Sequence, residues 1–127
     1  MDPARVKAIP IFSTLDDEAL RTIATFAGES SVPAGKRLLN EGDYAYEMMA
    51  IEEGEAEVVR GGKRLAVLGP GQFFGEMALL EKTVRMASVI ALTPMRLITV
   101  SHWDLKRVGP ALEQIHAILE ERKRQNA

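Results

Sequence analysis

The spacing of apolar residues divides the chain into a helical start, a β-rich middle and a helical end. Before Gly28, apolar residues recur at i, i+3, i+4 and i+7 from Leu20 onward, which is typical of an amphipathic helix. We therefore expect a helix over about 16–27, with Ser13 or Thr14 as its N-cap. A shorter helical piece is expected nearer the N-terminus.

In the middle of the chain, turns rich in glycine and proline separate short apolar segments at spacings of roughly 8–12 residues. This texture predicts a small all-β sandwich or barrel. The segments 55–60 and 63–68 flank two glycines, which can take the positive φ that a two-residue hairpin requires. The segments 87–92 and 95–100 predict a second pair of strands around a Thr-Pro turn.

From Ser101 the pattern returns to helix, first a short one capped by Ser101 and then a longer one after a Gly-Pro pair. The expected fold is mainly β with flanking helices: an antiparallel, jelly-roll-like β-roll with an N-terminal helix and two C-terminal helices. The helical start covers about 1–28, the β-roll 29–100 and the C-terminal helices 101–127.

Composition limits what such a chain does. A length of 127 residues with 46% hydrophobic and 27% charged residues predicts one folded domain. Sixteen Lys and Arg against 18 Asp and Glu give a net charge of −2, which provides no general field for nucleic acid. Any anionic ligand must be bound by a local arrangement.

The chain has no cysteine and two histidines, so we expect no metal site. No apolar run predicts a signal or membrane segment, so we expect a cytoplasmic protein.

The segment 71–89 breaks the strand pattern and needs a chemical explanation. Gly75 permits a sharp turn, and the good helix formers of 76–80 predict a short helix whose first N–H groups have no internal partner. Such a turn binds anions. Arg85 follows ten positions after Gly75, far enough for the chain to turn back and aim a guanidinium at two phosphate oxygens.

Glu76 is the unusual member of this segment, because a carboxylate beside an anion is repulsive unless it accepts hydrogen bonds. A cyclic nucleotide resolves the conflict. Its ribose 2′-hydroxyl donates to Glu76, while its singly charged phosphate pairs with Arg85 and the exposed N–H groups. The residue types therefore favour a sugar phosphate over a bare anion.

The sequence FGEMALL followed by RMASV, over 74–89, resembles the phosphate-binding cassette of cyclic nucleotide-binding domains. These domains occur in the bacterial catabolite activator protein, in the regulatory subunits of cAMP-dependent protein kinase and in cyclic-nucleotide-gated channels. The resemblance extends to EGD at 41–43, to GPGQFFGE at 69–76 and to the closing pair of helices. It implies a single cyclic nucleotide-binding domain over 1–127.

The resemblance also implies a role for each cassette residue. Glu76 would accept the ribose hydroxyl, and Arg85 would bind the phosphate. The backbone amides of Ala78 and Met86 would complete the phosphate cradle, and Ala87 would pack closely against the ligand. The implied ligand-binding residues are Gly75, Glu76, Met77, Ala78, Arg85, Met86 and Ala87.

In the family manner, the last helix would cover the base. The candidate lid residues are Leu112, Ile115, Ile118 and Leu119.

After the arginine many family members carry Ser, Thr or Ala, and Thr there is associated with cGMP. Met86 offers the guanine amino group no polar partner, so we predict cAMP as the ligand in preference to cGMP.

The resulting hypothesis is a regulatory sensor without catalytic residues, metal or cofactor. It would transmit ligand occupancy through its C-terminal helices to an effector domain or partner protein outside this chain, with no nucleic acid contact of its own. One alternative is a degenerate domain that serves as an interaction or oligomerisation module without ligand. Another is a small enzyme of the cupin kind. The chain has two histidines and no His-x-His pair, which argues against a metal-dependent enzyme of this kind.

Overall fold

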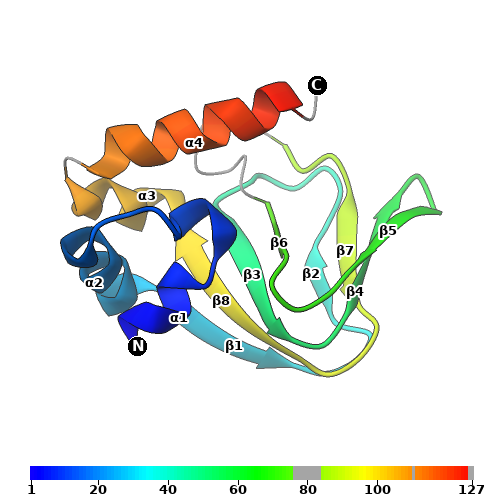
Figure 1. The fold of residues 1–127 in the computed structure, drawn as a ribbon. Helices are drawn as coiled ribbons and strands as arrows, with labels where there is room; N and C mark the ends of the chain where they lie inside the picture. The colour runs from blue at the N-terminus through cyan, green and yellow to red at the C-terminus, as the bar shows by residue number, and fades with distance from the viewer. Residues whose placement is uncertain (76–83, 110, 126–127) are drawn as a thin grey trace.

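The computed structural model describes residues 1–75, 84–109 and 111–125, with helices gathered along one side of two β-sheets (Figure 1). The elements in chain order are α1 (Pro3–Lys7), η1 (Pro10–Phe12), α2 (Asp17–Phe26), β1 (Gly28–Val32), β2 (Arg37–Leu39), β3 (Glu47–Glu53), β4 (Ala56–Arg60), β5 (Lys63–Leu68), β6 (Phe73–Phe74), β7 (Ser88–Ala91), β8 (Met95–Ser101), α3 (His102–Leu105), η3 (Lys106–Val108) and α4 (Ala111–Gln125).

Within the described residues, two four-stranded sheets form the β-roll. One has the strand order β1-β8-β3-β6 and the other β2-β7-β4-β5. Each pairing in the two sheets is antiparallel. The expected mainly β architecture with flanking helices is confirmed, and α4 runs across the top of the roll in Figure 1.

Among the residues that the structure describes, apolar side chains collect in two cores, one on each face of the first sheet. The helical core contains Val6, Ile9, Ile11, Phe12, Leu15, Ala19, Leu20, Ile23, Ala24, Met48, Ala50, Ile98, Val100, Leu105, Val108, Ile115 and Leu119. The inter-sheet core contains Leu39, Met49, Ile51, Ala56, Phe74, Val89, Ala91, Met95 and Leu97. Because successive residues of a strand point to opposite faces, β3 contributes to both cores, which explains its unbroken apolar run.

The N-cap of helix α2 lies two or three residues later than the expected cap. Asp16 is the N-cap, and its Oδ1 accepts a hydrogen bond from the Ala19 N–H at 2.8 Å. The expectation of Ser13 or Thr14 as the cap is wrong, because the Ser13 hydroxyl instead donates to the Pro10 carbonyl at 2.8 Å. A carboxylate at the N-cap also interacts favourably with the positive end of the helix.

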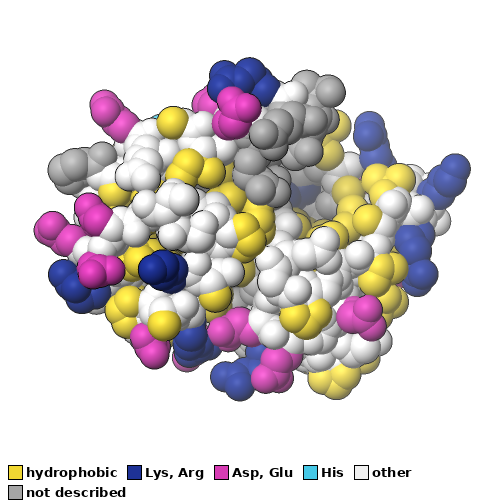
Figure 2. Space-filling model, in the orientation of Figure 1, with side chains coloured by type: hydrophobic (Ala, Val, Ile, Leu, Met, Phe, Trp, Pro, Cys, Tyr) yellow, Lys and Arg dark blue, Asp and Glu magenta, His cyan; other side chains and the backbone are white. Residues whose placement is uncertain are grey.

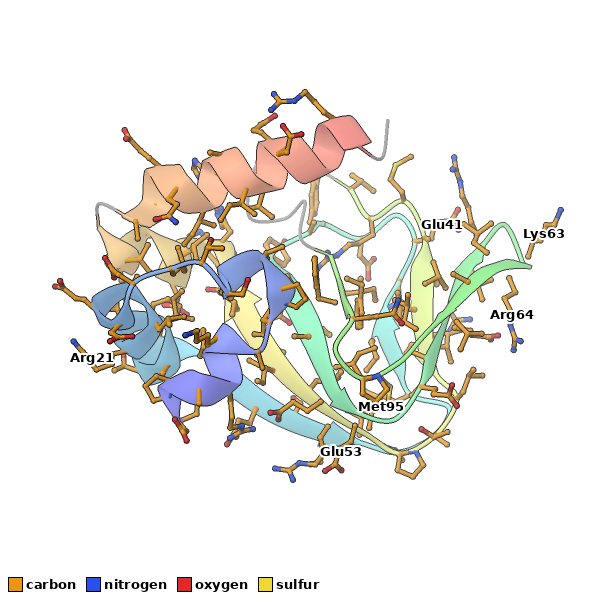
Figure 3. The ribbon with its side chains drawn as sticks, viewed as in Figure 1. Arg21, Glu41, Glu53, Lys63, Arg64 and Met95 are labelled. Atoms are coloured by element: carbon orange, nitrogen blue, oxygen red, sulfur yellow. The ribbon has the colours of Figure 1, made fainter. Side chains whose placement is uncertain are left out.

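The hairpin between β4 and β5 is confirmed. Arg60 pairs with Lys63, which leaves a loop of two glycines. Gly61 and Gly62 have φ of 58° and 78°, as a type I′ turn requires of both central residues. The Gly61 N–H donates to Glu41 Oε1 at 3.1 Å, so the hairpin tip is tied to the turn before β3 (Figure 3).

The second predicted strand pair is wrong, because β7 and β8 lie in different sheets. β7 pairs with β2 and β4, whereas β8 pairs with β1 and β3. The turn that connects β7 and β8 forms hydrogen bonds with Glu55. The N–H of Leu92 donates to the Glu55 carbonyl at 2.9 Å, and the N–H of Glu55 donates to Thr93 Oγ1 at 3.0 Å. These hydrogen bonds hold the turn against Glu55 rather than within a hairpin, and the chain crosses there from one sheet to the other.

An ion-pair cluster attaches α1 to the roll and gives the fold a pH dependence. Arg5 pairs with Glu29 of β1 and with Glu52 of β3, where Arg5 Nε donates to Glu52 Oε2 at 2.9 Å. This hydrogen bond, aided by the charge of Arg5, lowers the pKa of the Glu52 carboxyl below its ordinary value of 4.5, although burial opposes the shift.

Since the pKa of Glu52 is lower in the folded than in the unfolded state, the stabilisation is present above pH 4.5 and is lost as the pH falls through the folded-state value. We expect the free energy of unfolding to fall by about 1 kcal/mol more between pH 6 and pH 3 in the wild type than in Glu52→Gln. Urea denaturation at several pH values measures this. The exposed Glu55→Gln is the control, and it should follow the wild type.

Candidate functional site

A cavity of about 460 Å³ opens between the segment 38–49 and Arg85. The described residues that line it are Leu38, Leu39, Asn40, Gly42, Asp43, Tyr44, Tyr46, Glu47, Met49 and Arg85. Figure 2 shows the surface hollowed between the helical side and the β4–β5 hairpin. The volume lies within the range of about 300–1,000 Å³ that small-molecule sites occupy.

Arg85 is a buried cation at this cavity, with 9% of its surface exposed. Its Nη2 donates to the Glu47 carbonyl oxygen at 2.7 Å, and its Nη1 approaches the Gly75 carbonyl oxygen at 3.4 Å. The backbone of Arg85 is also held, since its N–H donates to the Asp43 carbonyl at 2.7 Å and its carbonyl accepts from the Gly42 N–H at 3.0 Å. The guanidinium is therefore oriented by the protein before any ligand is bound.

Gly75 brings the backbone against this guanidinium. It adopts φ of +76°, a conformation that side chains disfavour. A Cβ at this position would lie 2.6 Å from Arg85 Nη1 and 3.0 Å from the Glu47 carbonyl oxygen. Two residues ten apart in sequence thus meet at one point, and glycine is required there for both conformation and space.

The structure locates part of the predicted cassette. Glu76, Met77 and Ala78 lie outside the described residues. Met86 follows Arg85 with 66% of its surface exposed, and Ala87 is half-buried directly before β7.

The predicted lid residues lie on α4 and pack against the helical core. Ile115 and Leu119 are fully buried in it, while Leu112 and Ile118 are partly buried at its margin. None of these four is among the described lining residues of the cavity. Their role toward a base therefore stays a prediction.

Several residues of the cavity wall were not singled out from the sequence. Leu38, Tyr44 and Tyr46 line the cavity, and the Tyr46 ring stacks on Trp103 of α3 with 5.2 Å between ring centroids. Glu47 was also missed. The alternation of β3 was the available signal for Glu47, because it places this residue on the same face as the inward-facing Met49.

The charges at the cavity are mixed. Among the described lining residues, Arg85 is the one cation, whereas Asp43 and Glu47 carry carboxylates. Within 1–75, 84–109 and 111–125, no three histidine or acidic side chains gather closely enough to hold a metal ion. No helix in the described part of the chain has the length and apolar character needed to cross a membrane. The arrangement is suited to binding one small anion with polar neighbours.

The roll, the buried arginine and the cavity beside it define a ligand-binding domain of one known class. The family model described as cyclic nucleotide-binding domain matches residues 29–109. The chain belongs to this family, as its cassette predicted. It is 40% identical over 110 residues to the cAMP-dependent protein kinase regulatory subunit of Schizosaccharomyces pombe, a match that covers 85% of this chain and 27% of that protein. The chain thus spans about a quarter of the length of this relative.

Solved structures share the fold over nearly the whole chain. The N-terminal domain of a transcriptional regulator from Streptomyces coelicolor A3(2) has a TM-score of 0.80 and 27% identity, with 99% of this chain and 95% of that chain covered. The catabolite activator protein of Thermus thermophilus has a TM-score of 0.77 and 30% identity, with 92% and 59% covered. The β-roll with its flanking helices is therefore the family fold.

Proposed function

We propose that this domain binds a cyclic nucleotide, cAMP in preference to cGMP, and acts as a sensor rather than an enzyme. One observation carries the proposal: the Arg85 guanidinium is buried and oriented by the carbonyls of Gly75 and Glu47 at the edge of a cavity of about 460 Å³. A preoriented guanidinium suits a phosphate with two accessible oxygens. The names of two relatives, a cAMP-dependent kinase regulatory subunit and a cyclic AMP receptor protein, support cAMP.

In this proposal the cyclic phosphate binds Arg85 and the backbone amides of Ala78 and Met86. The ribose 2′-hydroxyl donates to the Glu76 carboxylate, which removes the repulsion between two anions. Gly75 keeps the chain close enough to Arg85 for both groups to reach one ligand.

Signal transmission is proposed to run through α4. Its lid candidates Ile115 and Leu119 are fully buried in the helical core, so covering a base requires α4 to move or to turn. A ligand that binds the rearranged state more tightly shifts the population toward it, by no more than its difference in affinity for the two states. An effector domain or partner protein would read the helix position.

Isothermal titration calorimetry of the wild-type chain with cAMP tests the proposal directly. A saturable heat with one nucleotide bound per chain is expected. No heat with cAMP or cGMP up to high micromolar concentration would overturn it and favour a domain that acts as an interaction module without ligand.

The preference for cAMP depends on Met86, which is 66% exposed and whose thioether sulfur is only a weak acceptor for a guanine amino group. We expect cAMP to bind at least roughly tenfold more tightly than cGMP, the size of effect that one missing hydrogen bond produces. The variant Met86→Thr should narrow this ratio. Competition titrations measure it, and a wild-type domain that bound cGMP tenfold more tightly would contradict the assignment.

A further inference from the structure

Glu47 is an acidic side chain at the cavity that the roles above leave unused. It is the first residue of β3, and Met49, two positions later on the same face, is buried in the inter-sheet core. Glu47 lines the cavity beside Arg85 and also a neighbouring cavity of about 310 Å³. The wall of the second cavity also carries two exposed cations, Lys36 and Arg37. The Glu47 carboxylate therefore stands on the inner side of the roll, next to the phosphate-binding guanidinium.

This carboxylate has no hydrogen bond or ion pair within the described part of the chain. Other glutamates of the sheets are paired, such as Glu52 with Arg5 and Glu57 with Arg64. The Glu47 backbone carbonyl holds Arg85 Nη2, but its side chain does not neutralise that cation. An unpaired negative charge beside an anion-binding group weakens the binding of every anion. Such a charge is useful where it weakens the binding of one ligand more than that of another.

We propose that Glu47 selects the charge of the ligand: it admits a phosphodiester with one negative charge and disfavours a phosphate monoester with two. This inference rests on the proposed function and names the property by which the site separates a cyclic nucleotide from its hydrolysed product. Asp43, which also lines the cavity, adds a second carboxylate in the same sense.

The reason is that Coulomb repulsion is linear in ligand charge. If Glu47 weakens binding of a monoanion by some factor, it weakens binding of a dianion at the same place by about the square of that factor. A hydrogen bond from Glu47 to a ribose or base would act differently, because it would strengthen both ligands alike. The ratio of two affinities therefore isolates the charge effect.

The test compares cAMP with 5′-AMP, in the wild type and in Glu47→Gln, by competition against a fluorescent cyclic nucleotide at pH 8. The expected result is a gain of about threefold for cAMP and about tenfold for 5′-AMP on removal of the charge. At pH 5 the monoester is mainly a monoanion, because its second pKa is about 6. There the gain for 5′-AMP should fall to that for cAMP at the same pH.

Two variants complete the test. Glu47→Asp keeps the charge and should keep the wild-type ratio of affinities. Glu55→Gln removes the same charge from an exposed position on the order of 25 Å further along the chain, and it should change neither ligand appreciably.

Equal gains for both ligands at pH 8, a loss of cAMP affinity in Glu47→Gln, or the same change in Glu55→Gln would each overturn the inference while leaving cyclic nucleotide binding intact. A wild-type domain that binds no cAMP would instead overturn the proposed function, and the inference with it.

Discussion

Replacing Arg85 by alanine is expected to lower the affinity for cAMP by about 100-fold, or roughly 3 kcal/mol, because the phosphate loses a charged partner that is buried in the protein. Arg85→Lys should recover only part of the loss. A lysine ammonium restores the charge but cannot donate to two carbonyls and the phosphate in one plane, as the arginine guanidinium does through Glu47 and Gly75. Calorimetric titration of both variants measures the effect.

Stability must be followed in the same experiment, because Arg85 is buried and its removal leaves the Glu47 carbonyl without this donor. Thermal unfolding of each variant separates a folded domain that no longer binds from one that has unfolded. A folded Arg85→Ala variant with wild-type affinity would show that the phosphate binds elsewhere.

The second large effect is expected at Gly75. Gly75→Ala would place a Cβ 2.6 Å from Arg85 Nη1 and 3.0 Å from the Glu47 carbonyl oxygen. The guanidinium is the end of a flexible side chain and must give way, so Arg85 loses the orientation that suits the phosphate. We expect cAMP affinity to fall by roughly 30-fold, measured by the same titration.

Gly71→Ala is the matched control. Gly71 has φ of +86°, close to that of Gly75, but a Cβ there would meet nothing within 4 Å. Both variants should lose about 1 kcal/mol of stability from the strained backbone conformation, and only Gly75→Ala should lose binding. Equal affinities for the two variants would show that contact with Arg85 is not the reason that glycine stands at position 75.

Two turns show what the local sequence pattern can and cannot predict: the hairpin at Gly61 and Gly62, and the strand connection at Thr93 and Pro94. Two glycines with positive φ are a local property, so the first turn was predictable from its residues. The second turn looks similar in sequence, yet its strands enter different sheets. Its hydrogen bonds go to Glu55, 37 or more positions away, and no local pattern contains that partner.

The candidate site also has features that the local sequence predicts and features that depend on distant residues. The sequence already indicated an anion-binding site, through the chemical types of the cassette residues and the ten-residue separation of Gly75 and Arg85. That the guanidinium is held by the carbonyl of Glu47, 38 positions earlier, and that Tyr46 stacks on Trp103, depended on how β3 meets the segments after it.

By itself the sequence determined the class of the domain, its alternation of helical and β segments and the residue types of an anion site, because these follow from periodicity, turn chemistry and short motifs. The tertiary structure decided which strands pair, which carbonyls orient Arg85 and which carboxylate lines the cavity beside it. These contacts join residues far apart in the chain, and their free energy comes from burial and hydrogen bonds that exist only once both sheets are assembled.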